Sequence, residues 1–207
     1  MQWQGILAGC LVTVIAWALS VFFAYGGIRR RKVFLRTLKL QGKWRRNRLI
    51  MAAIGILISC YGFWLYGFGW DYVMFMMLAS LLGAVTVTDL RSREIPDDAV
   101  LFYAVLFSIW TLLSLNTSMI FNGLIGALAG FAVPLFAYFV RKDSIGMGDI
   151  KLLGCIGLAG GFPGILFIIL RAMVFGGIFS IILLITKKGN MKTELPFAPF
   201  LLIAALI

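Results

Sequence analysis

Two aspartates stand at the ends of long apolar runs, where hydrophobic packing alone does not require a charge. Asp89 directly follows one apolar run and Asp149 directly precedes another, in a chain that has only eight acidic residues. A carboxylate at the start of a helix can serve as a cap, which would account for Asp149. A negative charge at the C-terminal end of a helix is unfavourable, so Asp89 has no such explanation. Because ionisable groups are costly in a membrane bundle, we interpret both as candidate functional residues.

A pair of carboxylates can activate a water molecule for hydrolysis. The ionised member takes a proton from the water, while the protonated member donates one to the carbonyl oxygen under attack. Two neighbouring carboxylates share a single proton because ionising both is costly. Gly146 and Gly148 leave room beside Asp149, and Pro96 stiffens the chain that follows Asp89. We therefore predict that Asp89 and Asp149 form a catalytic pair.

The composition indicates the class of protein. Hydrophobic residues make up 62% of the 207 residues and charged residues 13%, whereas a soluble domain is nearer half apolar and a quarter charged. Several apolar runs reach the length of roughly 20 residues that a membrane-spanning helix needs. Their near-continuous apolar character favours helices over a β-barrel. We predict an all-α polytopic membrane protein, with residues 1–207 forming a single transmembrane domain.

Seven apolar runs and a shorter terminal one predict a bundle of seven to eight membrane spans. The runs cover residues 5–26, 49–68, 72–88, 96–115, 119–140, 149–160, 165–186 and 196–207. The last run has twelve residues. It would form about 18 Å of helix, which is too short to cross the membrane alone. Glycines and a proline at 160–164 predict a tight turn on the outer side.

The basic residues predict the orientation of these spans. Ten of the 19 Lys and Arg residues lie between positions 29 and 48. Cytoplasmic loops are rich in Lys and Arg, and such clusters attract anionic lipid head groups. We therefore interpret 29–48 as a cytoplasmic loop that contacts lipid rather than nucleic acid. The first run, which no cationic residue precedes, is then a retained span and not a signal peptide. Counting spans from there places Asp89 and Asp149 on the cytoplasmic side.

The sequence offers little for a metal site or a cysteine mechanism. It has no histidine, and Cys10, Cys60 and Cys155 lie far apart within apolar runs. Since a structural zinc ion needs four nitrogen or sulfur ligands close together, we expect no metal and no cofactor. Arg171 is the one charge within the run at 165–186. It either pairs within the bundle or extends to the outer surface.

Three motifs, in this order, resemble the type IV prepilin peptidases and archaeal preflagellin peptidases, which are membrane aspartic proteases of the GxGD class. The motifs are Asp89 with Ile95-Pro96-Asp97, then Gly146-Met147-Gly148-Asp149-Ile150-Lys151, then Leu195-Pro196-Phe197-Ala198-Pro199-Phe200. The similarity spans residues 49–207. Ala198 stands where the family usually has a glycine.

The resemblance implies an aspartic endopeptidase with Asp89 and Asp149 as its catalytic residues. Lys151 would pair with a lipid phosphate or tune Asp149. The substrates would be pilin-like or archaellin-like precursors, from which such enzymes cleave a short basic leader at the cytoplasmic face of a prokaryotic inner membrane. The supporting motif residues would be Pro96, Gly146, Gly148, Lys151, Pro196 and Pro199.

Further acidic residues near the pair would attract a basic leader, unless they are merely solvated loop charges. They are Glu94, Asp97, Asp98 and Asp143. Many bacterial members of the family carry two CxxC pairs between the first two spans, which are associated with N-methylation of the new terminus. The loop at 29–48 has no cysteine. We therefore expect a short form with peptidase but no methyltransferase activity.

Two other functions fit the same aspartates. An intramembrane protease of the presenilin and signal-peptide-peptidase type also has a GxGD motif, but Thr88 precedes Asp89 where that type has a tyrosine. A proton- or cation-coupled transporter could use both aspartates as ion sites, although no internal repeat supports it. The paired motifs argue against a third reading, a pure scaffold protein. The sequence leaves the oligomeric state open.

Overall fold

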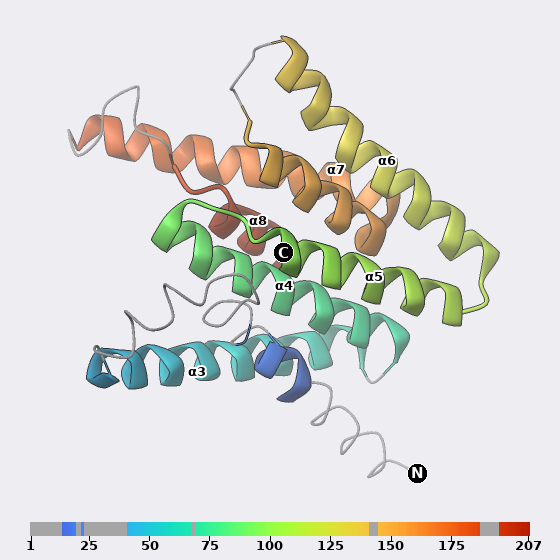
Figure 1. Ribbon diagram of the computed structural model, residues 1–207, viewed down its shortest axis with the longest axis horizontal. Coiled ribbons are helices and arrows are strands. Elements are labelled where there is room, and N and C mark those ends of the chain that lie inside the picture. Colours follow the sequence, from blue (N-terminus) through green and yellow to red (C-terminus); the bar gives the residue numbers. More distant parts are fainter. Residues whose placement is uncertain (1–13, 20–21, 23–40, 68, 141–144, 187–194) are drawn as a thin grey trace.

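The computed structural model describes residues 14–19, 22, 41–67, 69–140, 145–186 and 195–207, and this part of the chain contains helices and no strands (Figure 1). The labelled helices are α3 (Gln41–Tyr66), α4 (Trp70–Ser92), α5 (Asp97–Leu113), α6 (Thr117–Val140), α7 (Met147–Ile185) and α8 (Ala198–Leu206), and residues 14–19 are helical as well. The prediction of an all-α protein is confirmed for the described residues.

Three of the described helices, α4, α6 and α7, are long and apolar enough to cross a membrane. The apolar part of α3, Ala53–Tyr66, is shorter, and α5 has 17 residues. The protein is therefore a helical membrane protein, but the described helices do not establish the seven to eight spans that the sequence predicts. Most of the predicted span at 5–26 and much of the basic loop at 29–48 lie outside the described residues.

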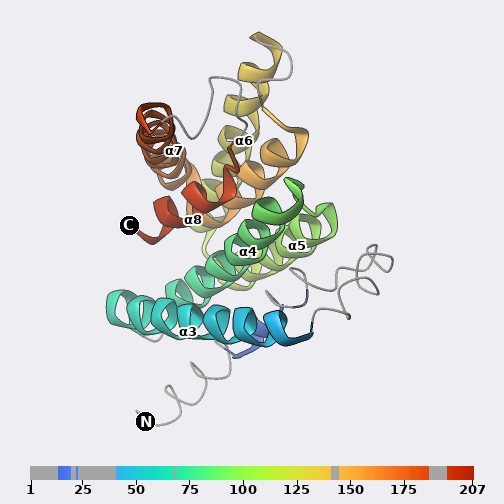
Figure 2. The same cartoon turned by 90° about the vertical axis from the view of Figure 1, so that its left-hand side faces the viewer.

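Helix α4 forms the centre of the bundle and packs against α3, α5 and α8 (Figures 1 and 2). Its apolar side chains on several faces, including Leu81, Leu82 and Val85, are fully buried. A helix that is apolar all round is expected to lie inside a bundle or in lipid. The buried hydroxyl groups of Ser80 on α4 and Tyr103 on α5 share a hydrogen bond of 2.7 Å. This pairing satisfies two polar groups that would otherwise be costly to bury.

Glycines let α6 and the first part of α7 pack closely. A Cβ atom on Gly126, Gly130 or Gly157 would collide with backbone atoms of the facing helix. Small residues at a crossing point are the usual means by which membrane helices bring their backbones together. This tight pair fixes where the N-terminal end of α7 lies.

The turn predicted at 160–164 is a break at one residue within α7. Gly161 has φ 68° and ψ 179°, whereas the residues on either side are helical. A glycine adopts positive φ at little cost. The side-chain Oδ1 of Asn122 on α6 accepts the N–H of Phe162 at 3.1 Å, which satisfies a donor that the break leaves open. Figure 1 shows the two parts of α7 running in different directions from this point.

Candidate active site

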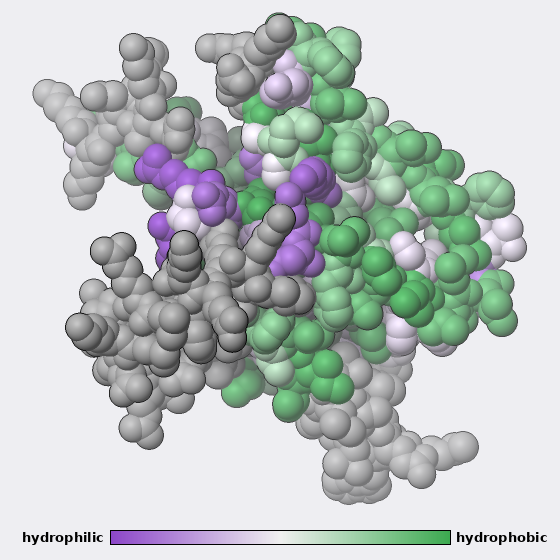
Figure 3. All heavy atoms as spheres, in the orientation of Figure 1, coloured by the Kyte–Doolittle hydropathy of each residue, from purple (hydrophilic) through white to green (hydrophobic). Residues whose placement is uncertain are grey.

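A pocket of about 660 Å³ lies where α4 ends and where α5, α7 and α8 begin. Candidate site residues that are far apart in the sequence meet in its lining: Asp89, Glu94, Asp97, Gly146, Gly148, Asp149, Lys151 and Pro196. Hydrophilic residues gather toward the left of Figure 3, the side on which Figure 1 shows the connection between α4 and α5, while the right-hand side of that face is apolar. The pocket thus lies at the polar end of a largely apolar bundle.

Asp89 lies in the last turn of α4 and is 7% exposed. Its Oδ2 accepts the backbone N–H of Ala198, the first residue of α8, at 2.9 Å. The first N–H groups of a helix have no partner within the helix and carry the positive end of its dipole. Asp89 is therefore unfavourably placed on its own helix but favourably placed at the start of α8. This contact joins the first motif to the third.

Pro199 follows Ala198 in the first turn of α8 and does not line the pocket. Proline has no N–H and fits the first turn of a helix, where that donor would have no partner. Pro196 does line the pocket, in the segment that leads into α8. The two prolines thus shape the entry to α8, and the buried backbone N–H that remains there belongs to Ala198.

Asp149 lies in the first turn of α7, after Gly146, whose extended backbone (φ −68°, ψ 143°) caps the helix. A Cβ atom on Gly146 would lie 3.1 Å from Asp149 Oδ2, and one on Gly148 would lie 3.0 Å from Cβ of Ile95. Both glycines therefore leave space that this packing uses. Asp149 and Asp89 line the same pocket and interact electrostatically. The structure thus brings the two predicted carboxylates together.

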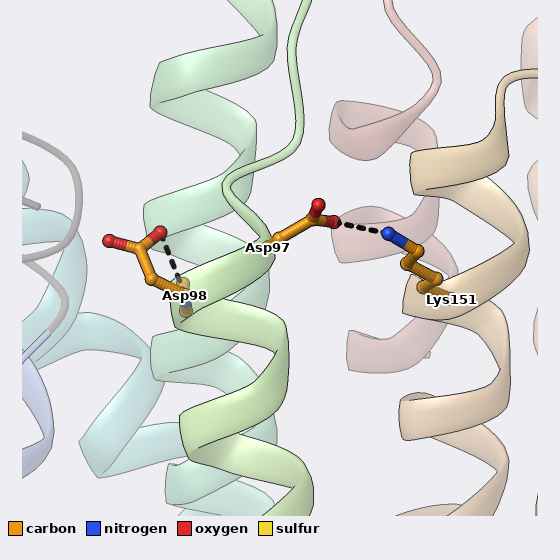
Figure 4. A network of polar contacts seen from close by, with 4 residues as sticks. Asp97, Asp98 and Lys151 are labelled. Carbon is orange, nitrogen blue, oxygen red and sulfur yellow. Dashed lines mark hydrogen bonds and ion pairs between the residues drawn. The ribbon is translucent and has the colours of Figure 1, made fainter. Parts of the chain in front are cut away.

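Lys151 lies in the second motif but pairs with Asp97 of the first (Figure 4). Its Nζ donates to Asp97 Oδ1 at 2.9 Å, and both side chains are exposed. This pair joins the first turn of α5 to the second turn of α7. The two roles that the sequence suggested for Lys151, pairing with a lipid phosphate or tuning Asp149, stay predictions.

The remaining acidic candidates differ in their position relative to the pocket. Glu94 lines the pocket, whereas Asp98 does not. Asp98 Oδ1 instead accepts the N–H of Ala99 at 3.1 Å, within the first turn of α5. Asp143 lies outside the described residues. Among the residues that the structure describes, no group of three or more His, Cys, Asp or Glu side chains could hold a metal ion.

The sequence did not mark Arg93 as a site residue. Arg93 lies between Asp89 and Pro96 in the sequence and lines the pocket. Arg93 has φ 53°, the left-handed region that non-glycine residues seldom adopt, and its N–H donates to the carbonyl oxygen of Asp89 at 2.9 Å. It ends α4 directly after the turn that carries Asp89. No sequence signal marks it, because glycine or asparagine is the usual residue at such a position.

Comparisons with known proteins indicate the family of the chain. The sequence model described as "Type IV leader peptidase family" matches residues 75–181, about half of the chain. A protein of Stutzerimonas stutzeri is 30% identical over 164 residues, which cover 77% of this chain and 56% of that protein. A protein of Xanthomonas campestris pv. campestris is 33% identical over 146 residues, with 68% and 50% covered. A third, from Pseudomonas aeruginosa, is 30% identical over 155 residues, with 73% and 53% covered.

Each of these three relatives is named "Prepilin leader peptidase/N-methyltransferase". The chain spans about half the length of the curated relatives it matches. No solved structure matches the chain.

Proposed function

Because the chain belongs to the type IV leader peptidase family, we propose that it is a membrane-embedded aspartic endopeptidase that removes short basic leader peptides from type IV pilin-like or archaellin-like precursors. The observation that carries this proposal is the meeting of Asp89 and Asp149 in one pocket at the polar end of the bundle. Their motifs lie about sixty residues apart in the sequence, so packing of α4 against neighbouring helices is what brings them together.

In this mechanism the two carboxylates hold one water molecule and one proton between them. One carboxylate accepts the proton of the water as it attacks the scissile carbonyl, and the other donates its proton to the carbonyl oxygen. We assign the first role to Asp89, because an N–H group donates more strongly to a carboxylate than to a neutral carboxyl and Ala198 donates to Asp89. Asp149 then carries the proton that the carbonyl oxygen receives.

The site would face the cytoplasm of a prokaryote whose inner membrane the chain crosses seven to eight times. The strongly basic segment at 29–48, of which residues 41–48 begin α3, supports this orientation, since the cytoplasmic flanks of membrane spans are rich in Lys and Arg. Arg91 and Arg93 come two and four residues after Asp89 and would lie on the same side. Span parity then puts the loop and the pocket on one face. The basic segment would contact anionic lipid head groups.

We propose that peptidase activity is the one reaction of this chain, although the names of its relatives also include N-methyltransferase. The predicted loop at 29–48 has no cysteine with which to form the paired CxxC motifs of methylating members. Mass spectrometry of the processed product decides this point. A free, unmethylated terminal amine is expected, and a methylated one would contradict it.

Cleavage of a pilin-like precursor in membranes tests the proposed function. Asp89→Asn and Asp149→Asn should each lower kcat/KM roughly 10²- to 10⁴-fold, the usual contribution of an acid–base residue. Asp71→Asn is the matched control, because Asp71 is an exposed aspartate in the first turn of α4, at the opposite end of that helix from Asp89. Full cleavage by either active-site variant, at wild-type expression, would exclude the pair.

A further inference from the structure

We propose that Asp97 recognises a basic side chain of the leader, and that Lys151 occupies Asp97 until that side chain displaces it. The inference rests on the proposed peptidase function and identifies the feature of the substrate that the site reads. It also gives Lys151 a role as an internal competitor for the substrate.

The pocket is locally acidic within a basic protein. The chain has 19 Lys and Arg against eight Asp and Glu. Two of the basic residues line the pocket, whereas four of the acidic ones do so: Asp89, Glu94, Asp97 and Asp149. A cleft in which one sign of charge is in excess concentrates ligands of the opposite charge. The pocket therefore suits a cationic ligand although the protein as a whole repels one.

Asp97 and Asp98 are neighbours in the sequence but face different surroundings. Asp97 lines the pocket, and Asp98 does not. Figure 4 shows their side chains pointing in different directions from the start of α5, with Asp97 toward α7. The Asp98 carboxylate accepts an N–H within its own helical turn. Of these two adjacent carboxylates, Asp97 is the one that a ligand in the pocket can reach.

The ion pair of Asp97 with Lys151 leaves Asp97 available. Lys151 Nζ lies 2.9 Å from Asp97 Oδ1, and the two side chains are 45% and 67% exposed respectively. Exposed ion pairs contribute little net stability, because water and salt screen them. Within the described residues, Oδ2 of Asp97 takes part in no hydrogen bond or ion pair. An incoming Lys or Arg can therefore bind Oδ2 first and then replace Lys151.

The position of Asp97 keeps its carboxylate suited to this exchange. It is the first residue of α5, where the helix dipole favours a negative charge. The buried Pro96 precedes it and holds the backbone. The backbone of Asp97 is thus held in place beside the proposed catalytic pair. Its partner Lys151 has a long, flexible side chain that can move away.

Binding of two labelled precursor peptides to the full chain in detergent tests the exchange. One peptide carries a single lysine in an otherwise neutral leader, and the other carries glutamine at the same position. Such pairs are made for each position of the leader in turn. Asp97→Asn should weaken binding of the best lysine peptide about five- to tenfold, to the level of the glutamine peptide. Lys151→Met should tighten the lysine peptide about two- to fivefold and leave the glutamine peptide unchanged.

Controls separate exchange from a structural role of the pair. The double variant Asp97→Asn with Lys151→Met should bind both peptides like Asp97→Asn alone. Without the Asp97 carboxylate there is no site for which Lys151 competes, so its removal should have no further effect. Asp98→Asn, outside the pocket, should bind both peptides like wild type. If Lys151→Met does not fold, the two peptides with Asp97→Asn still decide the question, since that change is isosteric and exposed. Weaker lysine binding by a folded Lys151→Met, or unchanged discrimination by Asp97→Asn, would overturn the inference.

The binding measurement does not depend on cleavage, so the two proposals can fail separately. Asp97-dependent binding of the lysine peptide without cleavage would refute the peptidase but keep the cation site. Cleavage of lysine and glutamine peptides with equal KM would keep the peptidase and refute recognition by Asp97.

Discussion

Asp89 Oδ2 accepts the backbone N–H of Ala198 at 2.9 Å, across 109 residues of sequence. One aspartate thereby lines the candidate active site and also holds the start of α8. A negative charge in the last turn of α4 is unfavourable for that helix, but the positive end of the α8 dipole lies directly against it. The terminal Pro-Phe-Ala-Pro segment is therefore part of the site through its backbone, even though its apolar side chains carry no chemistry.

This dual role predicts that two substitutions of Asp89, each of which removes the proposed catalytic carboxylate, differ in their effect on stability. Asp89→Ala leaves the buried N–H of Ala198 without an acceptor, which costs about 1–3 kcal/mol, whereas Asp89→Asn retains an amide oxygen that can accept it. Thermal unfolding in detergent should therefore show a lower Tm for the alanine variant than for the asparagine variant. Equal Tm values for the two would mean that the contact does not stabilise α8.

Local signals predicted the pair of aspartates but not what surrounds it. Asp89 and Asp149 each lie in a motif that is visible in the sequence, and the basic residues predict that both lie on one side of the membrane. The partners of Asp89 and Lys151 lie 109 and 54 residues away. Only the packing of α4, α5, α7 and α8 creates these contacts, so no local pattern could reveal them.

The break in α7 is a second feature that the local sequence predicted only in part. Glycines and a proline at 160–164 predicted a turn, and the structure confines the change of direction to Gly161. Asn122, on another helix, accepts the N–H that the break exposes, so the partner that stabilises the break comes from tertiary packing. A polar asparagine within the apolar run at 119–140 was the one available signal, and its role became visible only with the fold.

The close packing of α6 on α7 predicts a pair of glycine variants with opposite outcomes. Gly157→Ala should destabilise the protein by about 1–3 kcal/mol, because its Cβ would meet the backbone of α6 at Gly126. Gly164→Ala, in the same helix, has no heavy atom within 4 Å of its added Cβ and should be neutral or stabilising by up to about 1 kcal/mol. Tm values in one detergent compare them directly. Similar losses for both would contradict close contact between these helices.

Leu115 offers a position where the fold can be stabilised. It has φ 50° between α5 and α6 and is 89% exposed. A non-glycine residue in this conformation costs about 1–2 kcal/mol, so Leu115→Gly should raise the free energy of unfolding by about 1 kcal/mol. Leu112→Gly, at an exposed leucine within α5, is the control and should lower it by about 1 kcal/mol. If both variants lost stability equally, the turn would not be strained at Leu115.

A carboxylate pair that shares one proton predicts a bell-shaped dependence of kcat/KM on pH. At low pH both Asp89 and Asp149 are protonated and neither can accept the proton of the water, while at high pH both are ionised and neither can donate to the carbonyl oxygen. The two limbs belong to the pair as a unit, because each carboxylate changes the protonation of the other. Cleavage of one precursor over a wide pH range, with protein stability followed in parallel, measures the profile. A rate that rises through acidic pH and then stays level would require only one ionised carboxylate, and the partner aspartate would then have a structural role instead.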